Sequence, residues 1–151
     1  MDDILLNTDV LSNFTYSDSL SILKKLYNRS AFVTDFIMAD IVRGIQSGYK
    51  NLEAVLQAIQ EGWIQDVSLI MEKEKALFHS LSVSLSLGEA SGLAVAEARG
   101  FVFACDDKAA REESCRRNIP VIGTKDILDA AVKSNNITAR ESATIISGLE
   151  K

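Results

Sequence analysis

The chain has 151 residues, of which 47% are hydrophobic and 25% charged, and this balance is typical of a globular protein with one sizeable core. Its net charge of −5 excludes a protein that coats nucleic acid through positive charge alone, but it is compatible with acidic side chains that hold metal ions. No apolar run approaches the roughly 20 residues of a membrane span, and the first residues lack a signal-peptide pattern, so we expect one cytoplasmic domain over residues 1–151.

The first half of the chain alternates between predicted strands and helices. Short apolar runs predict strands, and apolar residues that recur at helical spacing predict helices. We expect, in order, a strand at 4–6, one or two helical turns at 8–14, a helix at 19–27 capped by Asp18, a strand at 31–34, helices at 35–47 and 51–61, and a strand at 63–67. Each strand is therefore followed by at least one helix.

The second half continues this alternation. We expect a helix at about 69–78, a helix that Glu89 opens and Gly100 ends, a strand at 101–104, a helix at 108–117, a strand at 120–122, and helices near 125–133 and 139–149. The helix that follows Glu89 has a small apolar face, and we expect its Glu97 and Arg99 to face water. The alternation predicts a doubly wound parallel sheet between helices, whose right-handed crossovers bring the carboxyl ends of all strands to one edge.

Acidic and amide side chains gather at the predicted carboxyl edge of this sheet. They follow the first, second and fourth strands or open the helix before the fourth, and they are Asn7, Asp9, Asp35, Asp40, Glu89, Asp106 and Asp107. Ligands of parallel sheets bind at this edge. Carboxylates gathered there can hold a hard divalent cation such as Mg²⁺ or Mn²⁺, which lowers the pKa of a water and stabilises the charge that develops in phosphodiester hydrolysis.

Each of these side chains also has a purely structural interpretation. The pattern at 86–89 matches a capping box, in which Glu89 satisfies helix amides without a metal, and Asp106 fits an N-cap. Asp40 and Arg43 are three apart on a predicted helix and fit a solvated ion pair. Asn7 fits a cap of its own helix. Convergence of these groups on one edge is what separates a metal site from a set of caps.

The two cysteines and the single histidine do not indicate a site. Cys105 and Cys115 are too few for a zinc site, and we expect buried thiols rather than a disulfide. His79 has no second histidine and no nearby nucleophile for a catalytic pair, so we expect a surface or packing residue. The chemistry of the chain is therefore expected to depend on oxygen ligands.

Six segments spread over nearly the whole chain form a specific series. They are LLNTDVLSNF (5–14), VTDFIMADIVRG (33–44), WIQDV (63–67), LGEASGLAVAEARG (87–100), DDKAAR (106–111) and IPVIGTKDIL (119–128). This series resembles the PIN-domain family of metal-dependent ribonucleases, which includes toxins of prokaryotic toxin–antitoxin pairs. The order GEA, DD, AR and GT resembles one PIN-like branch of prokaryotes. The resemblance implies a three-layer α/β/α fold with a parallel sheet of about five strands.

The resemblance also assigns the acidic positions of the family to this chain. The second to fourth positions fall on Asp40, on Glu89 and on the pair Asp106 and Asp107, where an ambiguity of one residue remains. The first position is usually aspartate in the family, and it holds Asn7 here. Asparagine can offer a carbonyl oxygen but no negative charge, so Mg²⁺ or Mn²⁺ should bind more weakly and activity should be reduced. Asp9 lies two residues later on a helical turn and is expected to point elsewhere.

The function implied by the resemblance is that of a metal-dependent endoribonuclease, toxin-like, which hydrolyses phosphodiester bonds of RNA. Arg111 lies about one helical turn beyond Asp107 and is expected to hold a phosphate, with Lys108 and Arg43 as further phosphate contacts. RNA is the expected substrate. An antitoxin protein is a further partner that the family's toxins imply, and a homodimer is the expected assembly.

Two other functions are compatible with the sequence. The first is a non-catalytic PIN-like module that binds nucleic acid or a regulatory partner, and its main support is Asn7 in the first acidic position. The second is a nucleotide-binding flavodoxin-like or receiver-type domain, which shares the alternating elements and an acidic pocket. The chain has no glycine-rich phosphate loop, so this second alternative ranks last.

Overall fold

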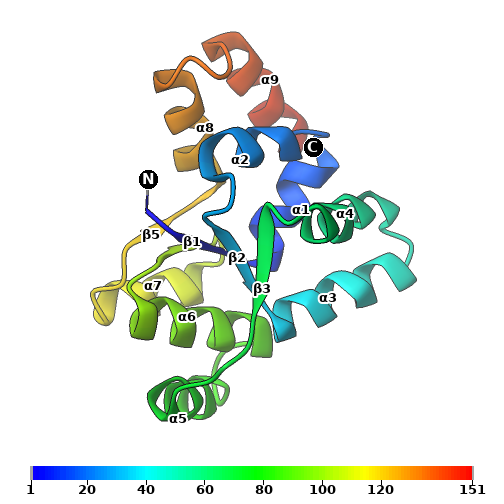
Figure 1. Cartoon of the computed structure of the whole chain (residues 1–151). Coiled ribbons are helices and arrows are strands. Elements are labelled where there is room, and N and C mark those ends of the chain that lie inside the picture. The colour runs from blue at the N-terminus through cyan, green and yellow to red at the C-terminus, as the bar shows by residue number, and fades with distance from the viewer. Residues whose placement is uncertain (1, 151) are drawn as a thin grey trace.

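The structure is a computed structural model that describes residues 2–150, and its centre is a parallel sheet of five strands. The strands are β1 (Ile4–Leu6), β2 (Ala31–Thr34), β3 (Ile64–Val67), β4 (Val102–Ala104) and β5 (Val121–Ile122), in the spatial order β3-β2-β1-β4-β5 (Figure 1). The chain moves outward from β1 to β3 and then crosses to β4 on the other side of β1. The carboxyl ends of β1 and β4 therefore flank the point where strand order reverses, which is where parallel sheets bind ligands.

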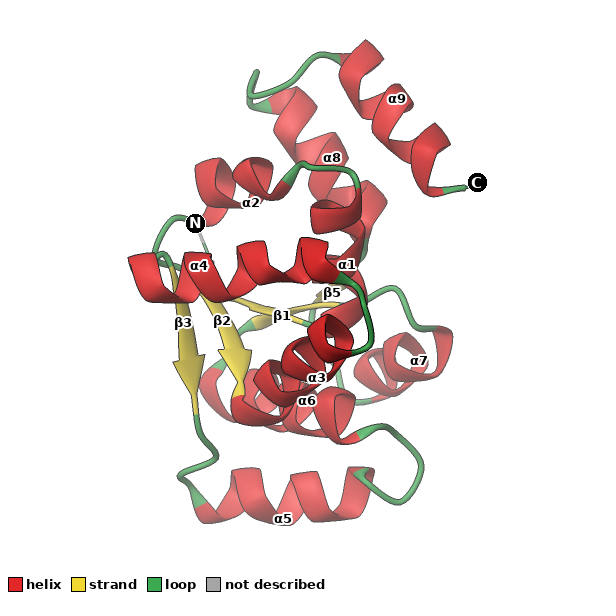
Figure 2. Cartoon of the chain, turned by 90° about the vertical axis from the view of Figure 1, so that its right-hand side faces the viewer, coloured by secondary structure: helices red, strands yellow, loops and turns green. Residues whose placement is uncertain are grey.

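Helices cover both faces of the sheet and give the predicted three-layer α/β/α fold (Figure 2). Their bounds are α1 (Thr8–Tyr16), α2 (Leu20–Tyr27), α3 (Asp35–Gln46), the 3₁₀ turn η1 (Lys50–Leu52), α4 (Glu53–Glu61), α5 (Glu72–Leu81), α6 (Leu87–Arg99), α7 (Lys108–Arg116), α8 (Thr124–Lys133) and α9 (Ala139–Leu149). One layer contains α6 against β1, β2 and β4, with α3 beside it, α5 on its outer side and α7 against β5. The other contains α1, α2, α4 and α8, with α9 packed on α8. No helix within residues 2–150 is long and apolar enough to cross a membrane.

The close approach of α6 to the sheet depends on a glycine. A Cβ atom at Gly92 would lie 2.6 Å from Cε1 of Phe103 on β4 and 2.9 Å from Cδ2 of Leu5 on β1. The bare backbone of α6 therefore rests directly on the two central strands. This contact fixes the first turn of α6, and with it Glu89, at the carboxyl edge of the sheet.

The order and type of the predicted elements are confirmed, and the start of α2 needs a correction. The strands at 4–6 and 31–34 and the helix at 139–149 have the predicted bounds. Asp18 was predicted to cap the second helix, and this prediction is wrong, because Ser19 is the N-cap residue. Asp18 has a left-handed backbone with φ of 55° and forms the tight turn before the cap.

Helix α5 begins and ends three residues later than predicted. Its start is fixed by Glu74, whose Oε1 accepts the amides of Ile70 and Met71 at 2.8 and 3.1 Å. The prediction that Arg99 faces water is also wrong, because its Nε donates to Oε2 of the fully buried Glu74 at 2.6 Å. Burial alone would raise the pKa of Glu74, but the guanidinium and the two amides outweigh burial and lower this pKa to about 2.

The cysteines are both free, as predicted, but only one of them is buried. Cys105 follows β4 and has no exposed surface, whereas Cys115 lies exposed on α7, so the expectation of a buried thiol is wrong for Cys115. Helix α7 lies at the edge of the layer, and its outer face is polar. His79 is exposed on α5, in agreement with a surface residue.

Candidate functional site

The predicted site residues come from four elements that meet beside the carboxyl ends of β1 and β4. Asn7 follows β1 directly, Asp40 lies on α3, and Glu89 lies in the first turn of α6. Asp106 and Asp107 lie in the turn between β4 and α7. The topology therefore brings together residues that are up to 100 positions apart in the sequence, as the parallel-sheet prediction required.

Asn7 occupies the N-cap position of α1, but its side chain does not cap the helix. Its Nδ2 donates instead to Oδ1 of Asp9 at 3.0 Å and to Sγ of Cys105 at 3.5 Å. The residue is only 5% exposed. The interpretation of Asn7 as a cap of its own helix is therefore wrong for the side chain. Within residues 2–150, no side chain or amide donates to the side-chain oxygen Oδ1 of Asn7, which stays available as an acceptor.

Asp9 fastens the β4–α7 turn to α1. Its Oδ2 accepts the backbone amides of Asp106 and Asp107, both at 3.0 Å, and its Oδ1 accepts the amide of Val10 at 2.7 Å. The expectation that Asp9 points elsewhere is wrong, because its Oδ1 accepts Nδ2 of Asn7 at 3.0 Å. Its role in the turn was not predicted. The sequence carried no signal for it, because these hydrogen bonds join residues 97 and 98 positions apart.

Asp40 lies where α3 approaches the start of α6. Its Oδ2 accepts the hydroxyl of Thr8 at 3.3 Å, and its Oδ1 forms an ion pair with Arg43 one turn along the helix. The side chain of Asp40 is 27% exposed. A Cβ atom at Gly88 would lie 2.6 Å from Asp40 Oδ2, so the glycine leaves the space that this carboxylate occupies.

Glu89 combines the predicted capping box with an unfavourable charge environment. Its amide donates to the Ser86 hydroxyl at 3.2 Å, and its Oε1 accepts the Ser86 amide at 3.3 Å. Burial raises the pKa of Glu89, and the nearby Asp107 carboxylate raises it further, against the lowering effect of the hydrogen bonds with Ser86. The capping box is thus confirmed, and it coexists with a pair of neighbouring carboxylates contributed by α6 and the β4–α7 turn.

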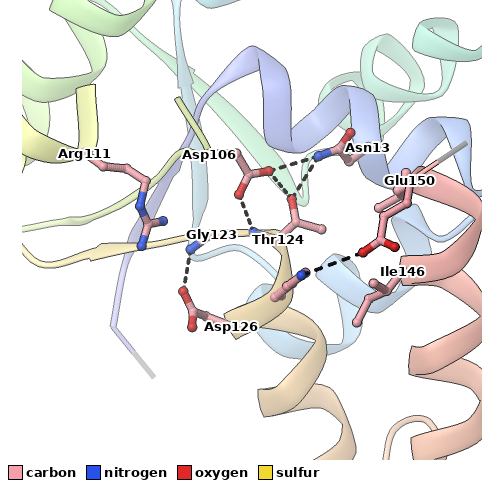
Figure 3. Close-up of a pocket in the computed structure, with 10 residues that line it drawn as sticks. Asn13, Asp106, Arg111, Gly123, Thr124, Asp126, Ile146 and Glu150 are labelled. Atoms are coloured by element: carbon pink, nitrogen blue, oxygen red, sulfur yellow. Dashed lines mark hydrogen bonds and ion pairs between the residues drawn. The ribbon is translucent and has the colours of Figure 1, made fainter. Parts of the chain in front are cut away.

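Asp106 and Asp107 have different surroundings. Asp106 Oδ1 accepts the amide of Thr124 at 2.8 Å, and its Oδ2 accepts the Thr124 hydroxyl and Nδ2 of Asn13 at 2.5 and 2.9 Å (Figure 3). Asp107 is the N-cap residue of α7 and accepts the amide of Ala110 at 3.1 Å. The N-cap considered for Asp106 therefore belongs to Asp107, which directly precedes the first residue of α7, Lys108. Asp106 instead ties β4 to the start of α8.

The three predicted phosphate contacts lie in different surroundings. Arg111 Nη1 donates to the carbonyl of Cys105 at 2.9 Å, and the guanidinium lines a cavity of about 410 Å³ with Asp106 and Thr124 (Figure 3). Lys108 is 91% exposed and lies 4.0 Å from a carboxylate oxygen of Glu112. Arg43 is exposed and paired with Asp40. Of the three cations, only Arg43 is paired with one of the predicted acidic site residues, Asp40.

The donor set of the site fits a hard cation in its chemistry. The side chains of Asn7, Asp40, Glu89, Asp106 and Asp107 all offer oxygen atoms, which Mg²⁺ and Mn²⁺ prefer as ligands. Gly88 leaves room for the Asp40 carboxylate, and the Glu89 and Asp107 carboxylates repel one another, a repulsion that a divalent cation would relieve. No group of three or more His, Cys, Asp or Glu side chains within residues 2–150 forms a ready metal cluster. At the first acidic position, the side-chain amide of Asn7 supplies an oxygen atom but no negative charge.

Comparison with protein families identifies one match. Residues 3–151 match the family model DUF3368, described as a PIN domain. PIN domains have a nuclease-type fold, bind nucleic acid and generally use divalent metal ions. The comparison with curated proteins found no match. The match covers all of the elements that build the site.

Proposed function

The chain belongs to the PIN-domain family, and we propose on that basis that it is a metal-dependent endoribonuclease, toxin-like, which acts on RNA in the cytoplasm. The observation that carries this proposal is the pair of carboxylates, Glu89 and Asp107, at the strand-order reversal. Burial raises the pKa of Glu89, and the neighbouring Asp107 carboxylate raises it further, so keeping both groups charged costs free energy in the isolated protein. Perturbed acids of this kind are typical of functional sites.

We assign the metal ligands to Asp40, Glu89 and Asp107, with the carbonyl oxygen of Asn7 in the fourth position. Asp107 is preferred to Asp106, because Asp106 already accepts three hydrogen bonds from Thr124 and Asn13, whereas Asp107 adjoins Glu89. A bound Mg²⁺ or Mn²⁺ would lower the pKa of a water and offset negative charge on the phosphodiester. The absence of a charge at Asn7 predicts weak metal binding.

The remaining polar groups of the site have roles in binding the RNA backbone. Arg43 on α3 and Lys108 at the start of α7 are exposed cations that can each contact a phosphate. Arg111 is held by the Cys105 carbonyl through one nitrogen, and its other donors remain for a phosphate. Binding of a phosphate by Arg43 would release Asp40 from its ion pair, so substrate binding and the freeing of a ligand would occur together.

Cleavage of a labelled mixture of structured RNAs in the presence of Mn²⁺ tests this proposal. We expect weak cleavage by the unmodified chain and none by Glu89→Gln, which removes the charge but preserves a capping-box residue. Glu53→Gln is the matched control, because Glu53 is exposed on α4, away from the site. Equal cleavage by all three proteins would contradict the assignment of Glu89.

A non-catalytic binding module is the second candidate function. The observation that favours it is that protein groups already satisfy the acidic side chains: Arg43 contacts Asp40, and Thr124 contacts Asp106. In this case Mn²⁺ should leave the melting temperature unchanged, whereas a true metal site should raise it by mass action. RNA binding without cleavage by any variant would support the module.

An antitoxin partner and a homodimer are further parts of the proposal, motivated by the likeness to toxins of this family. Val42 on α3 and Leu87 at the start of α6 are large apolar side chains that remain exposed beside the site. Exposed apolar side chains of this kind are compatible with a protein contact. Sedimentation of the purified chain and of Val42→Glu tests the homodimer: a dimer through this face should dissociate in the variant.

A further inference from the structure

Asn7 and Asp9 form a hydrogen-bonded pair at the centre of the site. The amide nitrogen of Asn7 donates to one carboxylate oxygen of Asp9, and the other oxygen accepts the amides of Asp106 and Asp107. The Asp9 carboxylate is thus in contact with donors on both sides. Asp9 therefore holds the backbone of the turn that carries Asp107, whereas the Asp106 side chain ties the same turn to Thr124 and Asn13.

We propose that Asp9 is the positioning residue for Asp107, and that Asn7 and Asp9 are a matched pair in which one position must carry an amide and the other a carboxylate. The proposal deepens the proposed function and rests on it for the metal, but the pairing itself is a property of the folded chain. It implies that the missing charge at position 7 is balanced by the charge at position 9.

The contact geometry explains why a single change at position 7 should fail. Asn7→Asp would place a second carboxylate in the place of an amide nitrogen that lies 3.0 Å from Asp9, at a residue that is only 5% exposed. The repulsion is only weakly screened at such a buried position. The neighbouring Cys105 Sγ lies 3.6 Å from Asp9 Oδ2, and a thiol supplies a weak donor but no positive charge.

Exchanging the two residues should restore the hydrogen-bonded pair, with the carboxylate at position 7 and the amide at position 9. In Asn7→Asp/Asp9→Asn, the amide oxygen at position 9 still accepts the amides of Asp106 and Asp107, and its NH₂ group donates to the carboxylate at position 7. The composition and net charge of the chain do not change. Two contacts are lost: the acceptor of the Val10 amide and the hydrogen bond from Nδ2 at position 7 to Sγ of Cys105. The negative charge moves from position 9 on α1 to position 7, directly after β1.

A double-mutant cycle in metal-free buffer tests the pairing. We expect Asn7→Asp and Asp9→Asn each to lower the melting temperature by about 3–6 °C. The double variant should lose less than the sum of these two decreases. A double variant that folds when Asn7→Asp alone does not fold gives the same support. Strictly additive losses, or a single Asn7→Asp variant as stable as the unmodified chain, would overturn the proposal.

A titration of the same proteins with Mn²⁺ separates positioning from simple stabilisation. The double variant should gain a larger Mn²⁺-dependent rise in melting temperature than the unmodified chain, because it has a carboxylate at position 7, and Asp9→Asn alone should show no such gain. An equal response of the double variant and the unmodified chain to Mn²⁺ would overturn the claim that the charge has moved into the site. If no protein responds to Mn²⁺ or cleaves RNA while the coupling persists, the proposed function fails and the matched pair stands.

Discussion

The guanidinium of Arg99 lies 2.6 Å from the carboxylate of Glu74, a side chain with no exposed surface, and this ion pair joins α5 to α6. Arg99 also donates to the carbonyl of Ser68 at 2.8 Å in the loop before α5. Arg99 lies in the last turn of α6, and Glu89 lies in its first turn. Anchoring of α6 at one end therefore supports the placement of the candidate site at the other.

Removal of one partner of this ion pair should be strongly destabilising. We expect Arg99→Met to lower the free energy of unfolding by about 3–5 kcal/mol, because it leaves the buried Glu74 carboxylate without its counter-charge. Denaturation by urea measures the loss. The control is Lys75→Met, which removes an exposed partner 3.9 Å from Glu72 and should cost less than about 1 kcal/mol. Similar losses in both variants would show that the buried pair has no special role.

Glu74 should also make the stability of the protein depend on acid. Its pKa is lowered from 4.5 to about 2 in the folded chain, so its stabilising contribution is complete above pH 4.5 and is lost as the pH falls toward 2. The contribution amounts to about 3 kcal/mol at neutral pH. Urea unfolding between pH 5.5 and 2.5 should show a flatter profile for Glu74→Gln than for the unmodified chain. Parallel profiles would contradict this origin of the acid dependence.

The order of elements could be predicted because each is encoded by local patterns. The run at 4–6, for example, is apolar and fully buried, and Gly100, with a φ of 72°, ends α6 as predicted. Arg99 was predicted to face water because it lies beside the polar face of α6. Its partner, the buried Glu74 carboxylate, lies on α5, and only the packing of the two helices brings the two side chains together. Short-range patterns therefore predict helices and strands, but not the partners of charges.

The site could be predicted as a set of residues, but not as a set of contacts. The topology argument placed Asn7, Glu89 and Asp107 at one edge, and the structure has them there. The difference between Asp106 and Asp107 depends on the amide of Thr124, 18 positions away, and the role of Asp9 depends on amides nearly 100 positions away. Such hydrogen bonds leave no periodic or local signal in the sequence.

Glu89→Gln should stabilise the metal-free protein while removing its response to metal. The pKa of Glu89 is raised by burial and by Asp107, so its ionisation opposes folding, and stability is lost as the pH rises through the raised value. Glutamine keeps the capping-box acceptor for the Ser86 amide. We expect a rise of about 1–3 °C in melting temperature at pH 7.5 and a smaller change at pH 4. Glu97→Gln, on the same helix but paired with the exposed Arg117, is the control and should not stabilise.

Gly88→Ala tests whether the Asp40 carboxylate must sit against the start of α6. The added methyl group would lie 2.6 Å from Asp40 Oδ2, so the carboxylate must move. We expect the affinity for Mn²⁺, measured from the rise in melting temperature, to fall by about tenfold or more. The rate of any RNA cleavage should fall by about the same factor, because a displaced ligand weakens the site.

The matched control for that change is Gly148→Ala on α9, where a Cβ atom has no neighbour within 4 Å. Alanine there should be neutral or stabilise the helix by up to about 1 kcal/mol, with an unaltered response to Mn²⁺. The stability of Gly88→Ala without metal is measured in parallel, because Asp40 keeps Arg43 as a partner after moving outward. A Gly88→Ala variant with normal Mn²⁺ response would remove Asp40 from the set of ligands, whereas a lost response with near-normal stability would place the Asp40 carboxylate among them.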